Sequence, residues 1–116
     1  MKTEIFVFNN TTYTIYVGQD KKDNWGLIDA SVTTDIWFHI AGLSSCHVVL
    51  KNTNNVKLRD IPRQVIKRCA YLCKINSSKN IKSIPKCDVI YAPISEVVKT
   101  DIVGQVYVTN YKTVST

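Results

Sequence analysis

Apolar and polar side chains alternate most clearly between residues 35 and 40 of this chain. Successive side chains of a β-strand point to opposite faces of the sheet, so this alternation predicts a strand with two different faces. One face is wholly apolar and consists of Ile36, Phe38 and Ile40. The other combines a carboxylate, an indole and an imidazole, from Asp35, Trp37 and His39. Because such groups are costly to bury without partners, this second face predicts a half-exposed site for a flat, polar or anionic ligand.

Similar patterns predict strands elsewhere in the chain. Further strands are expected at Glu4–Phe8, Thr12–Val17, His47–Leu50 and Cys87–Ala92. The first two flank a turn at Asn9-Asn10 and are expected to form a β-hairpin. Near the end of the chain, Gly104–Thr109 and Lys112–Ser115 are expected to form a closing hairpin around Asn110.

Two segments have the character of α-helices. Asp20 is a favourable N-cap for a first helix over Lys21–Ala30. Asp60 is expected to cap a second helix that has Pro62 in its first turn and runs to about Ile75.

The remaining segments carry weaker patterns. Ile81–Lys86 is expected to be irregular, and Ile94–Thr100 fits no single element. No repeat, low-complexity tract or linker divides the chain. We therefore expect residues 1–116 to form one α+β domain, with a mixed, mostly antiparallel sheet and two main helices.

The second helix is the most clearly amphipathic segment. Its apolar arc, which should pack on the sheet, consists of Ile61, Val65, Ile66, Cys69, Leu72 and Cys73. The opposite arc carries Arg63, Lys67, Tyr71 and Lys74. Three cations with an aromatic ring among them can follow a phosphate backbone, with the ring stacking on a base. The alternative interpretation is an ordinary solvated helix face whose long side chains cover apolar surface.

Composition and charge narrow the function further. With 45% hydrophobic and 21% charged residues, the chain is typical of a globular protein, and no apolar run approaches the length of a transmembrane helix. The net charge of +6 and the pI near 9.2 favour anionic partners, nucleic acid first and an acidic membrane surface second. The cations cluster between residues 51 and 86, where only Asp60 opposes Lys51, Lys57, Arg59, Arg63, Lys67, Arg68, Lys74, Lys79, Lys82 and Lys86.

The cysteines and the first residues of the chain indicate the cellular compartment in which the protein is expected. No secretory signal pattern precedes the first strand, so we expect a cytoplasmic protein with reduced thiols. Cys69 and Cys73 are spaced to lie on one helix face, but no C-x-x-C motif is present, and we interpret both as buried apolar residues. Without metal-ligand spacing we expect no metal site. Glycine-rich phosphate loops are absent too, so we expect no cofactor.

The two histidines, His39 and His47, lie on strands joined by a short loop and could reach one pocket. An enzyme acting on RNA or nucleotides would combine them with Asp35. A dyad of Cys46 with His47 is disfavoured, because adjacent strand residues point to opposite faces. We therefore assign no catalytic residue, and keep the Asp35/His39/His47 enzyme as an alternative.

Trp37 admits two interpretations from the pattern alone. Facing solvent, its indole would be a stacking platform for a base, an interaction worth roughly 1–3 kcal/mol. Covered by the first helix, it would be ordinary core.

Four sequence blocks resemble the signature of a known family, the NFACT-R domain, also called DUF814. The blocks are Tyr16-Val17-Gly18-Gln19-Asp20 with Asn24, Asp35–His39, Ser44–Leu50, and Gly104-Gln105-Val106. Their order and spacing match, and the resemblance covers nearly the whole chain. The segments Asp60-Ile61-Pro62, Cys69-Ala70 and Asn76-Ser77 are most similar to the coiled-coil domain-containing protein 25 branch. The family usually has Ser or Ala where this chain has Cys46.

This resemblance implies an RNA-binding module. In the family, the module belongs to proteins of ribosome-associated quality control that engage tRNA and the large ribosomal subunit. Those proteins' other domains have no counterpart within these 116 residues, so their activity in extending stalled chains is not transferred.

The leading hypothesis is therefore a non-catalytic module that binds tRNA or ribosomal or other structured RNA. Expected contacts with the nucleic acid come from Trp37, His39, Ser45, His47, Arg63, Lys67, Tyr71, Lys74 and Lys79. Asp35, Gly18 and Asn24 are expected to brace the site. Besides the enzyme, the alternatives are a DNA-binding module and a protein-interaction module that binds an acidic partner or forms homodimers.

Overall fold

A six-stranded sheet forms the centre of the computed structural model, which describes residues 1–116. Its strands run in the order β1 (Lys2–Phe8), β2 (Thr11–Val17), β4 (Val48–Leu50), β3 (Ile36–Ile40), β5 (Asp88–Pro93) and β8 (Lys112–Ser115), and every neighbouring pair is antiparallel. A separate two-stranded ribbon joins β6 (Val97–Lys99) to β7 (Val106–Val108). The predicted α+β class is confirmed, and the sheet proves to be wholly antiparallel.

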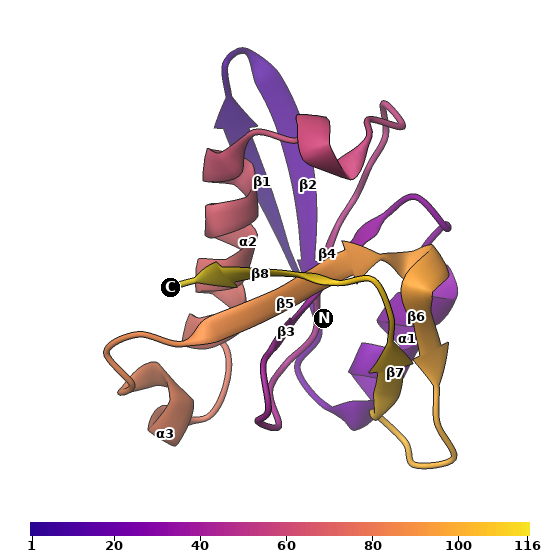
Figure 1. The fold of residues 1–116 in the computed structure, drawn as a ribbon, viewed down its shortest axis with the longest axis vertical. Coiled ribbons are helices and arrows are strands. Elements are labelled where there is room, and N and C mark those ends of the chain that lie inside the picture. Colours follow the sequence, from indigo (N-terminus) through magenta and orange to yellow (C-terminus); the bar gives the residue numbers. More distant parts are fainter.

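Two layers cover the sheet on opposite faces (Figure 1). The helix α2 (Arg63–Ile75) packs on one face and builds the larger core with β2, β3, β4 and β8. The helix α1 (Lys21–Ala30) and the β6–β7 ribbon cover the other face with a smaller core. Short helical turns occur at α3 (Lys79–Lys82), η1 (Leu58–Asp60) and η2 (Ile94–Glu96).

Strand β3 has the two faces that the alternation predicts. Ile36, Phe38 and Ile40 are buried in the core under α2. Trp37 points the other way and is buried against Leu27 and other residues of the smaller core. Because α1 covers this second face, its central part is not exposed to solvent.

The helix starts differ in how well the sequence predicted them. At α1, Asp20 is the N-cap as expected, and its carboxylate accepts a hydrogen bond from the Asp23 N–H at 2.8 Å. At α2 the expected cap is wrong, because the helix begins after Pro62 and Asp60 lies in the separate turn η1. A residue before proline is forced away from the helical region, and Ile61 is indeed extended, so the helix cannot start earlier.

The expected closing hairpin is also wrong, although both of its strands exist. β7 pairs with β6, and β8 pairs with β5 at the edge of the large sheet. Asn110 has a φ of 50°, and the chain turns there from one sheet to the other. β8 in its observed place buries Val114 in the core under α2. Alternation identifies a strand but does not choose its partner.

Two weaker expectations need correction as well. The segment Ile94–Thr100, which fitted no element, supplies η2 and the strand β6. The segment Ile81–Lys86, expected to be irregular, overlaps the short helix α3, where Ile81 is buried. No helix in the structure is both long enough and apolar enough to cross a membrane.

Two isoleucines of the β1–β2 hairpin allow a matched test of the core. Ile15 is 0% exposed and Ile5 is 58% exposed. Ile15→Ala should lower the free energy of unfolding by about 2–5 kcal/mol, because it leaves a cavity under α2. Ile5→Ala should change it by less than about 0.5 kcal/mol, as is usual for exposed positions. Urea unfolding followed by circular dichroism measures both, and equal losses would contradict this description of the hairpin.

Candidate nucleic-acid interface

Trp37, His39 and His47 form a single cluster on the α1 side of the sheet. The Trp37 Nε1–H donates a hydrogen bond to His47 Nδ1 at 3.1 Å. The His39 ring stacks on the indole, with centroids 5.5 Å apart and planes 11° from parallel. The two imidazoles meet edge to face at 5.1 Å. The structure therefore brings together three of the predicted site residues.

The hydrogen bonds fix which ring nitrogens carry protons. Because His47 Nδ1 accepts from Trp37, the neutral His47 ring carries its proton on Nε2. His39 Nδ1 lies 2.7 Å from the Ile40 carbonyl, which can only accept, so this nitrogen is the protonated one. Nε2 of neutral His39 is left as an acceptor.

Burial keeps both rings neutral. Desolvation and, to a smaller extent, the neighbouring His39 lower the pKa of His47 to about 3, and a hydrogen bond with the Gly104 backbone opposes the shift. Desolvation also lowers the pKa of His39, opposed by its hydrogen bond to the Ile40 backbone. Neither imidazole is therefore a cation at neutral pH.

Gly18 and Asn24 hold His47 in place. The His47 N–H donates to Asn24 Oδ1 at 3.1 Å, and the Gly18 N–H donates to the His47 carbonyl at 2.8 Å. A Cβ atom on residue 18 would lie 2.1 Å from Asn24 Oδ1, so only glycine fits there without displacing the amide. These three residues act as one unit that joins β2, α1 and β4.

Asp35 braces a different part of the molecule. Its carboxylate accepts hydrogen bonds from the Val32 N–H at 3.0 Å and the Asn52 N–H at 2.9 Å, and Lys51 Nζ lies 3.7 Å away. It stands at the opposite end of β3 from His39, about 13 Å along the strand. The structure therefore does not assemble the alternative Asp35/His39/His47 site. No group of three or more His, Cys, Asp or Glu residues is placed to hold a metal ion.

Trp37 is core, which decides between its two interpretations. Its side chain is 1% exposed, because α1 and the β6–β7 ribbon cover one side of it and His39 stacks on its ring. The expectation of an exposed stacking platform is wrong. The role that the geometry gives Trp37 is to orient His47 and support His39.

A cleft of about 420 Å³ opens beside His39. The β3–β4 loop and the β6–β7 loop form its sides, and the first turn of α1 closes one end. Its polar lining comes from Lys21, Asn24, His39, Ser44, Ser45 and Gln105. Lys21 and Gln105 were not predicted as site residues. The block Gly104-Gln105-Val106 was the signal in the sequence that could have indicated Gln105.

The β3–β4 loop is fastened to the end of α2. The Ser45 Oγ accepts from the Ile40 N–H at 3.1 Å and donates to the Cys46 carbonyl at 3.0 Å. The buried thiols of Cys46 and Cys73 each donate to the other residue's carbonyl, at 3.2 and 3.3 Å. All four cysteines are free thiols. Cys46 therefore packs against α2 and is absent from the cleft lining.

The expected phosphate-binding face of α2 needs one correction. Arg63, Lys67 and Tyr71 are exposed, but Lys74 is only 9% exposed. Its Nζ donates to the Thr116 backbone oxygen at 3.1 Å and the Pro85 carbonyl at 3.5 Å. Helical periodicity placed Lys74 on the outer arc, but the segments around residues 85 and 116 cover that position.

Arg68 extends the surface around Tyr71 and is held in place. Its guanidinium makes a two-point contact with the Glu4 carboxylate at 2.7 and 2.6 Å. It also lies 5.4 Å from the centroid of the Tyr71 ring. Hydrogen bonding to Arg68 lowers the pKa of Glu4, so the pair is charged at neutral pH.

A basic hollow of about 290 Å³ lies between the start of α2 and the β5–β8 edge. We call it the basic groove, and its charged and aromatic lining consists of Arg59, Arg63, Lys112 and Tyr91. No carboxylate lines it. Burial raises the pKa of the Tyr91 hydroxyl, opposed by the charge of Arg63. Arg59 and Lys112 were not predicted as site residues. Lys112 is far from α2 in the sequence, and only the pairing of β8 with β5 brings it beside that helix.

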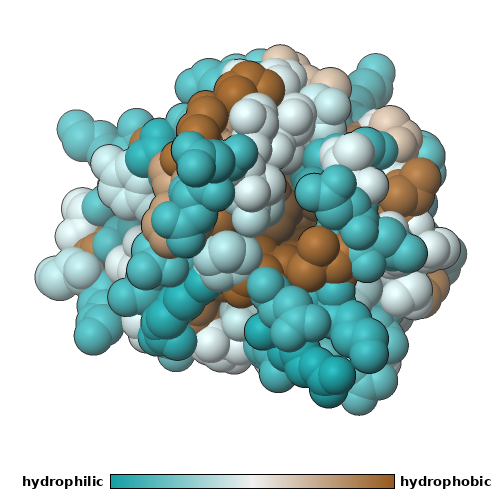
Figure 2. Space-filling view, turned by 90° about the horizontal axis from the view of Figure 1, so that it is seen from above, coloured by the Kyte–Doolittle hydropathy of each residue, from teal (hydrophilic) through white to brown (hydrophobic).

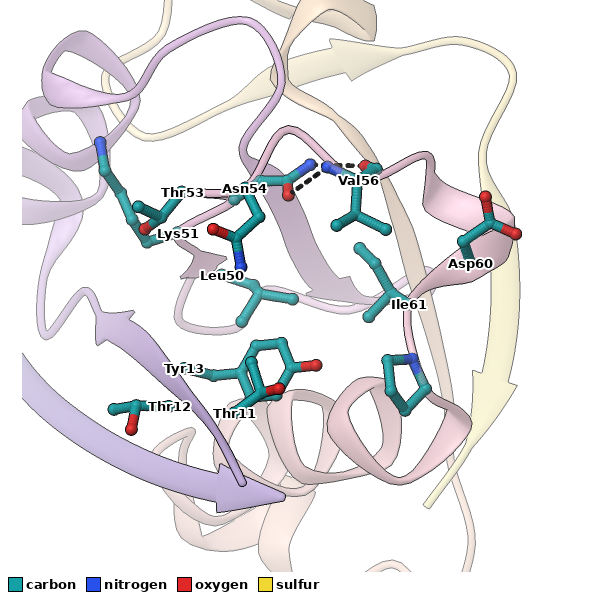
Figure 3. Close-up of a pocket in the computed structure, with 12 residues that line it drawn as sticks. Thr11, Thr12, Tyr13, Leu50, Lys51, Thr53, Asn54, Val56, Asp60 and Ile61 are labelled. Atoms are coloured by element: carbon teal, nitrogen blue, oxygen red, sulfur yellow. Dashed lines mark hydrogen bonds between the residues drawn. The ribbon is translucent and has the colours of Figure 1, made fainter. Parts of the chain in front are cut away.

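A third hollow, of about 150 Å³, lies between the β1–β2 hairpin and residues 50–62 (Figure 3). Tyr13, Leu50 and Ile61 face one another across it. Seen from above, it has an apolar floor between hydrophilic side chains (Figure 2). Its two charged residues are Lys51, which lies near the carboxylate of Asp35, and Asp60. It lacks the convergent cations of the basic groove.

Replacement of two glycines tests the Gly18–Asn24–His47 unit. Gly18→Ala should destabilise the fold, because the new methyl group would collide with the Asn24 amide. Gly26→Ala in α1 meets nothing within 4 Å and should stabilise the fold by up to about 1 kcal/mol. Thermal unfolding of both variants measures the difference. A Gly18→Ala protein as stable as the wild type would contradict the close packing.

The low pKa of His47 predicts a pH-dependent stability. The pKa of His47 is about 3 in the folded chain and about 6.5 in the unfolded chain. As pH falls below about 6.5, the unfolded chain therefore binds a proton on His47 and the folded chain does not. Between pH 7.5 and 5 the free energy of unfolding should therefore fall by about 2 kcal/mol from this residue. His47→Gln offers the indole an amide oxygen that does not titrate and should remove this part of the slope. Parallel pH profiles for the two proteins would contradict the assignment.

Comparison with known proteins shows the family to which this chain is similar. The family model described as "NFACT protein RNA binding domain" matches residues 2–110. Coiled-coil domain-containing protein 25 of Mus musculus is 45% identical over 92 residues, which is 79% of this chain and 44% of that protein. Protein JLP2 of Saccharomyces cerevisiae is 40% identical over 87 residues, covering 72% of this chain and 41% of that protein. The chain thus spans less than half the length of these curated relatives.

One solved structure shows the same fold at low sequence identity. It is the C-terminal part of the fibronectin/fibrinogen-binding protein from Streptococcus suis, with a TM-score of 0.80 and 20% identity. The similarity covers 99% of this chain and 45% of that one. From the match of its sequence over almost its whole length, this chain belongs to the NFACT RNA-binding domain family.

Proposed function

We propose that this chain is a non-catalytic module that binds structured RNA, either tRNA or ribosomal RNA, in the cytoplasm. The observation that carries the proposal is the basic groove, where Arg59, Arg63 and Lys112 converge without a carboxylate in the lining. Guanidinium groups suit this task because they hold phosphate oxygens by paired hydrogen bonds and remain charged. Family membership supports the same class of ligand.

The distribution of charge over the two faces supports the proposal further. On the α2 side, Lys67, Lys79, Lys82 and Lys86 are exposed in addition to the basic groove. On the α1 side, the lysines of α1 and β6 are interspersed with Asp20, Asp23, Asp29, Glu96 and Asp101. Such an asymmetric field attracts a polyanion to one face. The α2 side is therefore the surface that we assign to the phosphate backbone.

Two tyrosine rings on this side, one exposed and one half-buried, add a contact beyond charge. Tyr71 is exposed on α2, and Tyr91 lines the basic groove. Arg68 holds its guanidinium over the Tyr71 ring, so ring and cation are presented together. Aromatic rings can stack on unpaired bases of RNA, which are the usual points of sequence recognition.

Substitution of the groove cations should weaken RNA binding and its salt dependence together. Arg59→Ala, Arg63→Ala and Lys112→Ala should each lower affinity for tRNA and reduce the slope of log affinity against log salt by roughly 0.7–0.9 per lost phosphate contact. Lys22→Ala, an exposed lysine of α1 on the other face, is the matched control and should change neither. Fluorescence anisotropy at several salt concentrations measures both quantities.

Three nucleic acids of equal length make this experiment decisive about the partner. A tRNA, a structured ribosomal RNA fragment and a DNA duplex are compared at the same ionic strength. Tighter binding of either RNA supports the proposal. Equal affinity for the DNA duplex would overturn the preference for RNA and leave a module that binds nucleic acids of either kind. An affinity for RNA that does not depend on salt would overturn the proposal as a whole.

A further inference from the structure

The cleft beside His39 has sides of a different character from the basic groove. Leu43 of the β3–β4 loop and Ile102 and Val103 of the β6–β7 loop line it, and all three are exposed large apolar side chains. Exposed apolar side chains scattered singly need no explanation, but here three of them surround one opening. The cleft therefore offers apolar surface to a ligand on both sides.

The floor of the cleft carries two polar nitrogens without protein partners. Asn24 uses its Oδ1 to accept from the His47 N–H, and its Nδ2 makes no hydrogen bond within the protein. His39 uses Nδ1 on the Ile40 carbonyl, and its Nε2 also has no protein partner. Trp25 Nε1 is the single buried side-chain polar atom that lacks a partner, so both of these nitrogens must be open to solvent. They give the cleft one free donor and one free acceptor.

The rim adds a cation and is held by close packing. Lys21, in the first turn of α1, lines the cleft, and no carboxylate does. Gly104 has a φ of 85°, and a Cβ atom there would lie 3.1 Å from the Lys21 side chain. The β6–β7 loop and the start of α1 are thus in contact, which fixes Lys21 beside the opening.

We propose that this cleft holds one unpaired nucleotide of the bound RNA. The base lies between Leu43 and the two apolar side chains of the β6–β7 loop, its edge meets Asn24 Nδ2 and His39 Nε2, and its phosphate lies near Lys21. The volume of about 420 Å³ falls in the range of small-ligand sites, roughly 300–1,000 Å³. Apolar sides with a few polar groups at the floor are the usual composition of such sites.

This inference rests on the proposed function and refines it. The basic groove and the cleft lie on different sides of the sheet, so they would contact different parts of one RNA. Phosphate contacts position a nucleic acid, whereas base contacts specify it. The cleft would therefore add hydrogen bonds to the edge of an unpaired base, which the cations of the basic groove do not supply.

The test compares two RNA hairpins with identical stems and closing loops. One has a blunt end, and the other carries a short single-stranded extension. The wild-type protein should bind the extended hairpin roughly tenfold more tightly, as expected for one accommodated base. The imidazole Nε2 resonance of His39 should shift on binding of the extended hairpin, and the resonances of His47 should shift less.

Two variants of the β6–β7 ribbon give a matched control. Ile102→Asp places a carboxylate in the cleft at a position that is 57% exposed, and Val98→Asp adds the same charge outside the cleft at a position that is 61% exposed. Ile102→Asp should abolish the gain from the extension while binding of the blunt hairpin stays equal to that of Val98→Asp. Both exposed positions should leave the fold intact, which thermal unfolding checks.

The outcomes separate this inference from the proposed function. Binding of both hairpins with equal affinity, unaffected by Ile102→Asp relative to Val98→Asp, would overturn the nucleotide cleft and leave the RNA-binding module standing. Absence of binding to either hairpin at low salt would overturn both. A gain from the extension that Val98→Asp also removes would assign the contact to the outer face of the ribbon instead.

Discussion

The hydrogen bond from the buried Trp37 indole to His47 is the interaction on which the site depends. A buried indole N–H needs a partner, and a buried imidazole loses its charge. Each group satisfies the other, so both can lie under α1. The Asn24 amide and the Gly18 N–H then fix the backbone of His47. One small polar network therefore sets how β2, β3, β4 and α1 meet.

Neutral histidines follow from that network and shape what the site can do. Since burial lowers both imidazole pKa values, the cluster adds no positive charge to the surface. Attraction of a polyanion must come from elsewhere, and the structure provides it on the α2 side through Arg59, Arg63 and Lys112. His39 is left with an uncharged acceptor, which suits a contact to a base edge better than a contact to phosphate. In the proposed function, the phosphate contacts of the basic groove and the base-edge contact of the cleft lie on opposite faces of the sheet.

Local features of the fold could be predicted from the sequence, and features that depend on distant segments could not. The two faces of β3 and the Asp20 cap need only neighbouring residues, and both were predicted correctly. The partner of β8 and the burial of Lys74 depend on contacts between segments that lie 27 and 42 residues apart in the chain. Helical periodicity identifies the side of α2 that faces the sheet, but it cannot show that residues 85 and 116 cover part of the opposite side.

The fate of Trp37 shows how a correct pattern can lead to a wrong role. Alternation placed its side chain on the face opposite the main core, and the structure agrees. The inference that this face is exposed failed because a second layer, α1 and the β6–β7 ribbon, covers it. Burial of the indole nevertheless creates the site, since its ring supports His39 at the edge of the covered region. The atom that we propose faces the ligand is therefore His39 Nε2, two residues along the strand, where the second layer ends and the cleft begins.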